Sequence, residues 1–268
     1  MAELDHSTRA VFVSHGAPSI VIDDSPASRF LAGLGAQLGR PRAIVVATAH
    51  WTTRAPAVSA AAWPETIHDF GGFDPALYKM RYAAPGAPEL AADIARRLTV
   101  AGFAPGIDPT RGFDHGVWTP LMLMYPAADI PVVSLSVQPQ RDPDHHVRLG
   151  AALRPLLEQD VLLLGSGAAT HDLRRFVGQA IDVPEAPDVR GFADWLCAKT
   201  EASDVAALSD IWAQAPGARA NHPSPEHLLP FHVALGAGAG HGTRIHRSSS
   251  YGVLAMDAYR FAPASPKE

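Results

Sequence analysis

Four runs of apolar residues along the chain lack the polar alternation of a half-exposed strand. They lie at about 10–14, 43–50, 131–137 and 160–165, and Val, Ile and Leu dominate them. Uninterrupted apolar runs of this length are typical of strands that are buried on both faces, as in parallel sheets. The pattern therefore predicts a central sheet with both faces covered.

Between and after these runs, apolar residues recur at helical spacing. The clearest case is ELAADIARRLTVAG, where Gly102 is placed to end a helix. The helices that we expect lie at about 26–38, 87–101, 117–124, 143–158, 188–201, 203–213 and 225–238. Alternating strands and helices predict an α/β fold, with a mostly parallel central sheet flanked by helices.

No internal repeat or long linker divides the sequence. Near its end, TRIHRSSSYGVLAMDAYRF predicts two further strands joined at Ser249–Gly252. We expect residues 1–268 to form a single domain with a core at about 10–258. In open α/β sheets ligands bind beyond the carboxyl ends of the strands, so a functional site is expected at that edge.

Composition and charge exclude several classes of protein. The formal net charge is −5 without a basic cluster, which disfavours nucleic-acid binding. No apolar run approaches the roughly 20 residues of a membrane span, and MAELDHSTRA lacks the features of a secretory leader. The single cysteine, Cys197, is expected to be a buried structural thiol in a cytoplasmic protein.

Histidine is frequent, with 13 in the chain, and its placement is more informative than its number. His15 and His50 each end an apolar strand, and GSGAATH brings His171 to the same sheet edge. Each alone could be a hydrogen-bonded structural residue, but three at one edge favour a metal site. We expect three other histidines, His6, His145 and His146, to be exposed to solvent.

The segment NHPSPEHLLP places His227 beside Glu226 near the start of an expected helix. Ser224 is a candidate N-cap and Pro225 a candidate first helical residue. Glu226 could simply stabilise the helix N-terminus. His232, on the apolar helix that follows, is expected to be a satisfied core or surface residue. No HEXXH or G-x-S-x-G motif occurs, which disfavours common zinc proteases and serine hydrolases.

Eight motifs occur in an order that is similar to a known family. They are SHGAP (14–18), ATAHW (47–51), IHDFGGF (67–73), YAAPG (82–86), GFDHGVWTPLMLMYP (112–126), IPVVSLSV (130–137), GSGAATHDL (165–173) and PSPEHLLP (223–230). Together they resemble the DODA-type extradiol aromatic ring-opening dioxygenases, class III enzymes related to the catalytic subunit of protocatechuate 4,5-dioxygenase. The resemblance extends over about residues 10 to 258.

This resemblance implies a non-haem Fe(II) enzyme that uses O₂ to cleave a catechol ring beside its hydroxyls, giving a muconic semialdehyde-type product. It implies that His15, His50 and His227 are metal ligands and that His115 borders the substrate. His171 is implied at the metal centre, either as acid/base catalyst or, with Zn(II) in the site, as a fourth ligand. Three ligands on one side leave positions for catechol and O₂, so we favour the acid/base role.

A neutral set of three histidines departs from the common two-histidine, one-carboxylate arrangement of non-haem iron oxygenases. Glu226 could supply the carboxylate. Adjacent helical residues point in different directions, however, so His227 and Glu226 are not expected to bind one ion. We favour His227 as the ligand, on the motif match.

Other residues near the motifs are candidates for supporting roles. Metal-bound imidazoles usually donate their second N–H to a carboxylate or carbonyl, so one of Asp69, Asp114 and Asp172 could orient a ligand. Candidates for an aromatic pocket wall are Trp51, Trp118, Phe70 and Phe73. Candidates for contact with a substrate carboxylate are Arg54, Lys79 and Arg81.

Two other functions are compatible with the same histidines. Three histidines and a water on Zn(II) would suit a zinc hydrolase, and the fold could also serve a metal-binding module without turnover. The particular catechol stays open among DOPA, caffeate, protocatechuate, gallate and homoprotocatechuate. The ring-cleavage position, the native metal and the oligomeric state are not readable from the sequence.

Overall fold

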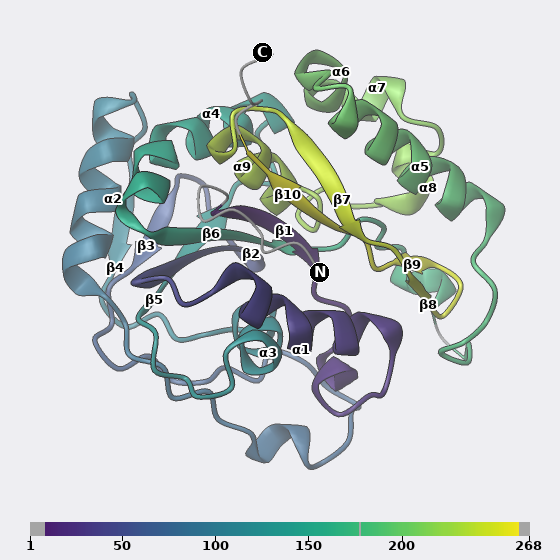
Figure 1. Ribbon diagram of the computed structural model, residues 1–268, viewed down its shortest axis with the longest axis horizontal. Helices are drawn as coiled ribbons and strands as arrows, with labels where there is room; N and C mark the ends of the chain where they lie inside the picture. Colours follow the sequence, from purple (N-terminus) through teal and green to yellow (C-terminus); the bar gives the residue numbers. More distant parts are fainter. Residues whose placement is uncertain (1–8, 177, 263–268) are drawn as a thin grey trace.

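A mixed β-sheet runs through the centre of the molecule, with helices on both faces (Figure 1). The computed structural model describes residues 9–176 and 178–262. Over that part of the chain, the sheet has the strand order β4-β3-β5-β2-β6-β1-β10-β7. Its strands are β1 (Ala10–Ser14), β2 (Ala43–Thr52), β3 (Ala57–Ser59), β4 (Gly106–Asp108), β5 (Val132–Val137), β6 (Val161–Gly167), β7 (Gly242–His246) and β10 (Ala258–Phe261).

The four central strands β5, β2, β6 and β1 are parallel neighbours. Val45 of β2, for example, lies between Val133 of β5 and Leu163 of β6. These strands correspond to the four apolar runs, so the mostly parallel sheet is confirmed. The pairs β1–β10, β10–β7 and β3–β5 are antiparallel. The short strands β8 (Ser249–Ser250) and β9 (Leu254–Ala255) form a separate hairpin between β7 and β10.

Helices cover both faces of the sheet, and a further group of helices lies beyond β7 (Figure 1). In Figure 1, α1 and α3 lie on one face, and α4 and α9 lie on the other, while α5 to α8 extend past β7. Their bounds are α1 (Pro26–Leu38), α2 (Pro88–Val100), α3 (His115–Met124), α4 (Pro143–Leu153), α5 (Pro187–Glu201), α6 (Val205–Ser209), α7 (Ile211–Gln214), α8 (Ala218–Asn221) and α9 (Leu229–Ala237).

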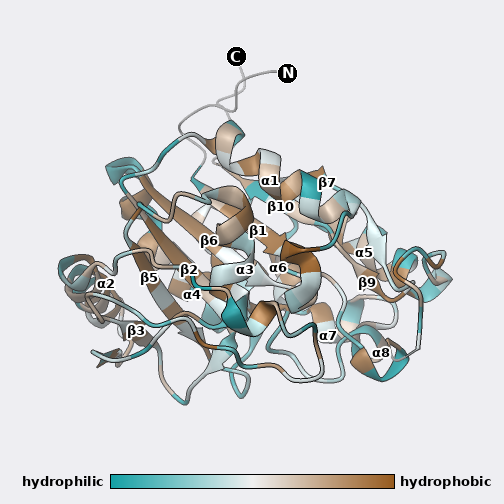
Figure 2. Cartoon of the chain, turned by 90° about the horizontal axis from the view of Figure 1, so that it is seen from below, coloured by the Kyte–Doolittle hydropathy of each residue, from teal (hydrophilic) through white to brown (hydrophobic). Residues whose placement is uncertain are grey.

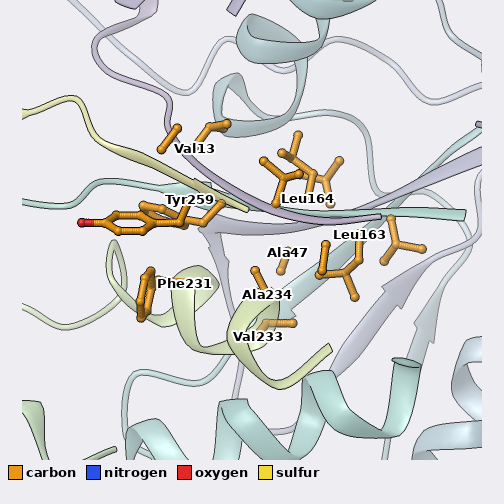
Figure 3. Packing of buried hydrophobic residues seen from close by; sticks show 14 of the residues in the cluster. Val13, Ala47, Leu163, Leu164, Phe231, Val233, Ala234 and Tyr259 are labelled. Carbon is orange, nitrogen blue, oxygen red and sulfur yellow. The ribbon is translucent and has the colours of Figure 1, made fainter. Parts of the chain in front are cut away.

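The core lies between the parallel strands and the helices on each side. Figure 2 shows the central strands as hydrophobic ribbons and the outer loops as mostly hydrophilic. On one face Phe231 and Ala234 of α9 point up toward the sheet, where Leu163 and Tyr259 lie (Figure 3). Burial of these side chains fixes α9, and therefore the segment just before it, against the sheet.

Close backbone contacts make α9 hard to displace. A Cβ on Gly150 of α4 would overlap the Val233 carbonyl oxygen, and one on Gly236 of α9 would overlap the Val147 carbonyl oxygen. The two helices therefore approach each other through reciprocal glycines, which no larger residue could replace without separating them.

Three boundary predictions were wrong. The helix expected at 225–238 begins only at Leu229, and Ser224 does not cap it. Pro230 has no N–H to donate to the Glu226 carbonyl, and the His227 carbonyl accepts from the Ala168 amide instead. The segment 203–213 forms two short helices, and α4 ends at Leu153 before a 3₁₀ segment, Arg154–Gln159.

The expected exposure of His145 and His146 was also wrong, since both side chains are buried. His146 accepts from the Gln138 amide at Nε2 and donates to the Asp142 carbonyl at Nδ1, both at 3.0 Å. His145 donates to the Gln138 side-chain oxygen. His6 lies outside the described residues. Across the described ranges, no helix has both the length and the apolar character needed to cross a bilayer.

Candidate metal centre and active site

Three histidines from separate parts of the chain meet at the carboxyl edge of the sheet. His15 follows β1, His50 lies near the end of β2, and His227 precedes α9. The His50 Nε2 atom lies 3.1 Å from Nε2 of His15 and 3.2 Å from Nε2 of His227. The structure thus brings together the three residues that the sequence nominated as ligands.

The second nitrogen of each ring faces an acceptor. His15 Nδ1 lies 3.0 Å from Ser166 Oγ, whose own hydroxyl donates to the Gly116 carbonyl, so this oxygen accepts from His15. His227 Nδ1 lies 3.1 Å from Glu226 Oε1, and His50 Nδ1 lies 3.4 Å from Asp69 Oδ2. With the protons on Nδ1, each Nε2 presents a lone pair toward the other two.

This donor set fits a metal ion. Three lone pairs that converge at hydrogen-bond distance repel one another unless a cation lies among them. Two nitrogens that bind one ion at about 2.1 Å and at right angles lie about 3.0 Å apart, close to the observed separations. The open side of the three rings faces a cavity.

Burial keeps these imidazoles neutral, the form in which they bind metals. It lowers the pKa of His15 and of His227 well below the ordinary value, and the neighbouring histidines add to this effect. Burial and then His115 lower the pKa of His50 to about 3.

Asp69 is the one carboxylate among the three sequence candidates that contacts site histidines. Its Oδ1 accepts from the His115 backbone N–H at 2.9 Å and lies 3.0 Å from His115 Nδ1. Burial alone would raise the pKa of Asp69, but the hydrogen bonds with His115 lower it to about 2. Asp114 instead bonds Thr48 and Arg111, and Asp172 caps the turn at Leu173–Arg175.

His171 lies beside the three histidines rather than among them. Its ring stacks on that of His227, with centroids 3.4 Å apart. A ring nitrogen of His171 lies within 4.8 Å of possible ligand atoms of His227 and Glu226. His15 and His50 form a separate set of possible ligands with His227. Burial lowers the pKa of His171 to about 4. The arrangement leaves His171 free to act on a molecule in the cavity.

Glu226 and His227 adjoin each other in a turn rather than in the helix that was expected. Glu226 Oε1 contacts His227 Nδ1 and accepts from the Ser224 hydroxyl at 2.7 Å. Glu226 is therefore placed behind the His227 ring, on the side away from the converging Nε2 atoms.

Backbone contacts lock the loop that carries His171 to the segment that carries His227. The Ala168 amide donates to the His227 carbonyl at 2.8 Å, and a Cβ on Gly167 would overlap that carbonyl. The His171 amide donates to the Asn221 carbonyl at 2.7 Å. Buried His222 lies 2.8 Å from the Ala169 carbonyl through Nε2. These bonds explain the stacked rings.

The cavity in front of the histidines has a volume of about 330 Å³. Its polar lining comes from the histidines and Asp69, and its apolar lining includes Phe70, Phe73, Leu173, Phe176, Leu254 and Met256. Among the described residues that line it, none is Lys or Arg. The expected cations Arg54, Lys79 and Arg81 therefore lie outside the cavity wall.

Of the four aromatic residues expected to line a pocket, Phe70 and Phe73 do so. Trp118 is instead fully buried and donates to the Ile67 carbonyl, and Trp51 packs under the Arg111 guanidinium. The contact of Ser166 with His15 was not predicted, although the place of Ser166 in GSGAATH beside His171 was a signal. Leu254 and Met256 carried no signal because they enter the site from β9 and the segment after it, far along the chain from the other site residues.

The sequence matches the family described as the catalytic LigB subunit of aromatic ring-opening dioxygenase, over residues 10–261. The chain belongs to this family, and it is an extradiol ring-cleaving dioxygenase that acts on a small aromatic molecule with O₂.

Relatives with curated descriptions are similar over nearly the full length. The chain is 41% identical to a 4,5-DOPA dioxygenase extradiol of Beta vulgaris, covering 97% of this chain and 99% of the relative. It is 38% identical to a protein of the same description from Escherichia coli (strain K12), covering 86% of each. A crystal structure of an uncharacterized protein from Escherichia coli K12 superposes with a TM-score of 0.80 at 32% identity, covering 95% of this chain and all of the other.

Proposed function

We propose that this chain is an Fe(II)-dependent dioxygenase that opens the ring of a catechol beside its two hydroxyls. The observation that carries the proposal is the convergence of the Nε2 atoms of His15, His50 and His227 beside a cavity. These residues would hold the ion. Bound Fe(II) would supply the redox chemistry that allows O₂ to react with the ring, which Zn(II) cannot do because it has no accessible redox state.

The three histidines lie on one side, so the cavity side is left for the reactants. We assign His115 to the substrate, since its ring borders the cavity and its Nδ1 is held by Asp69. Its Nε2 is then an acceptor for a catechol hydroxyl proton. The apolar residues that line the cavity, including Phe73 and Met256, exclude water from the bound ring.

We assign His171 to proton transfer rather than to permanent metal binding. Its ring lines the cavity and stacks on His227, so a ring nitrogen can reach a substrate bound in front of the three histidines. A neutral imidazole can take a proton from a catechol hydroxyl and return it later in the cycle.

For the substrate we propose DOPA, as in the names of the relatives, and a muconic semialdehyde-type product. The absence of Lys and Arg from the described residues that line the cavity supports this choice. The amino and carboxylate groups of DOPA are separated from the ring by a carbon chain and can extend toward solvent. A carboxylate bonded directly to the ring would be buried without a partner, which is unfavourable.

The test uses anaerobically prepared metal-free protein, reconstituted with Fe(II) and then given L-DOPA and O₂. The expected result is a yellow ring-fission product with one O₂ consumed per molecule of product. Protein loaded with Zn(II) should bind L-DOPA without consuming O₂. The proposal fails if Fe(II)-loaded protein consumes no O₂ with L-DOPA or any other catechol, or if zinc supports the same turnover.

A further inference from the structure

Asp69 lies between two imidazoles that belong to different parts of the site. Its Oδ1 accepts from the backbone N–H of His115 and lies 3.0 Å from His115 Nδ1. Its Oδ2 lies 3.4 Å from Nδ1 of His50. One carboxylate therefore contacts a proposed metal ligand and a proposed substrate-binding residue at the same time.

A carboxylate can only accept hydrogen bonds, so these contacts select one tautomer of each ring. His115 must carry its proton on Nδ1 to donate to Oδ1 of Asp69, and Oδ2 of Asp69, 3.4 Å from Nδ1 of His50, favours a proton on that nitrogen too. The lone pair of each then lies on Nε2. For His50 this nitrogen faces His15 and His227, and for His115 the ring borders the cavity.

We propose that Asp69 is a positioning residue that fixes the orientation and the tautomer of His50 and His115 together. This inference rests on the proposed function, since it assigns His50 to the metal and His115 to the substrate. Asp69 itself touches neither metal nor substrate in this proposal. It keeps Nε2 of His50 available as a ligand and Nε2 of His115 available as an acceptor.

The position of Asp69 in the chain gives this contact a second effect. Its neighbours Phe70, Gly71 and Phe73 line the cavity on the same loop. The hydrogen bonds that Asp69 accepts from His115 hold this loop against the start of α3. The wall that receives the substrate is thus fastened to the histidines by the same carboxylate that orients them.

Asp69→Asn separates a positioning role from a packing role. An amide has one acceptor oxygen and one donor NH₂. If the oxygen keeps the bonds to His115, the NH₂ faces His50 Nδ1 and favours the tautomer with the proton on Nε2, the nitrogen that would otherwise offer its lone pair to the metal. Asp69→Glu keeps two acceptor oxygens and serves as the conservative rescue.

The measurement is zinc affinity by competition with a chromogenic chelator, which does not depend on turnover. Asp69→Asn should bind zinc about 10–100-fold more weakly than wild type, the usual effect of removing a group that orients a metal-binding histidine. Asp69→Glu should bind more tightly than Asp69→Asn. Asp74→Asn is the matched control, because Asp74 is exposed on the same loop and only caps the turn at Ala76. The zinc affinity of Asp74→Asn should equal that of wild type.

The proposal is overturned if Asp69→Asn binds zinc as tightly as wild type, or if Asp69→Glu binds no more tightly than Asp69→Asn. A second measurement needs no variant: long-range ¹H–¹⁵N spectra of the wild type should show the His115 proton on Nδ1, and a proton on Nε2 instead would overturn it. If the wild type binds no metal at all, the proposed function fails, while the tautomer of His115 still decides the role of Asp69.

Discussion

His146 allows a quantitative test of how burial controls the acid stability of this fold. Its ring is fully buried, with Nδ1–H donating to the Asp142 carbonyl and Nε2 accepting from the Gln138 amide. Burial lowers the pKa of His146 from the ordinary 6.5 to about 3. A proton on Nε2 would face the Gln138 N–H, donor against donor, so the folded chain resists protonation.

The sign and size of the effect follow from proton linkage. Between pH 6.5 and about 3 the unfolded chain binds a proton at His146 that the folded chain does not bind, so stability decreases as the pH falls. At pH 5 this residue alone lowers the free energy of unfolding by about 2 kcal/mol relative to pH 7.5. Total stabilities of domains are roughly 5–15 kcal/mol, so the loss is measurable.

The assay is urea unfolding of metal-free wild type and His146→Gln at pH 7.5 and at pH 5. Glutamine keeps a donor and an acceptor but does not titrate, so its loss of stability between the two pH values should be about 2 kcal/mol smaller than that of wild type. Val147→Ala on the same helix is the control. It should cost about 1–2 kcal/mol of apolar burial at both pH values without changing the pH dependence. An equal pH dependence in wild type and His146→Gln would refute the reasoning.

Three further predictions concern the site. Gly167→Ala should weaken zinc binding by at least about tenfold, because the added Cβ would overlap the His227 carbonyl and displace that residue. The control is Gly191→Ala, which has open space around the added Cβ and should bind zinc as tightly as wild type. His171→Gln should keep its metal content but consume O₂ about 10²–10⁴-fold more slowly, and an unchanged rate would remove His171 from proton transfer. Because no Lys or Arg lines the cavity among the described residues, kcat/KM from O₂ uptake should be higher for L-DOPA than for protocatechuate, and the reverse order would contradict the proposed binding mode.

Much of the fold was predictable because its central strands are unbroken apolar runs. Val45, for example, is buried between two neighbouring strands of the same character. The short strands β3 and β4 gave no such signal, since each has only three residues. The start of α9 was mispredicted because the His227 carbonyl accepts a hydrogen bond from the distant Ala168 amide and not from an amide within a helix.

The histidines of the site were predictable from their places at strand ends and in recognisable motifs. The choice of Asp69 among three acidic candidates was not, because it depends on how the loop folds back onto His50 and His115. The burial of His146 was missed for a similar reason. Its partner Gln138 belongs to the loop before α4, and nothing in the local pattern marks this pairing.

The histidines and several of the apolar residues that line the cavity are carried by different kinds of structure. His15 and His50 extend from buried central strands, whereas Phe73, Leu173 and Phe176 lie outside the sheet, in surface loops and the short 3₁₀ turn at Leu173–Arg175. Recognition and reactivity can therefore diverge independently during evolution. A gene duplicate could acquire a new aromatic substrate through changes in these loops alone, and saturation mutagenesis confined to them offers protein engineers the same route.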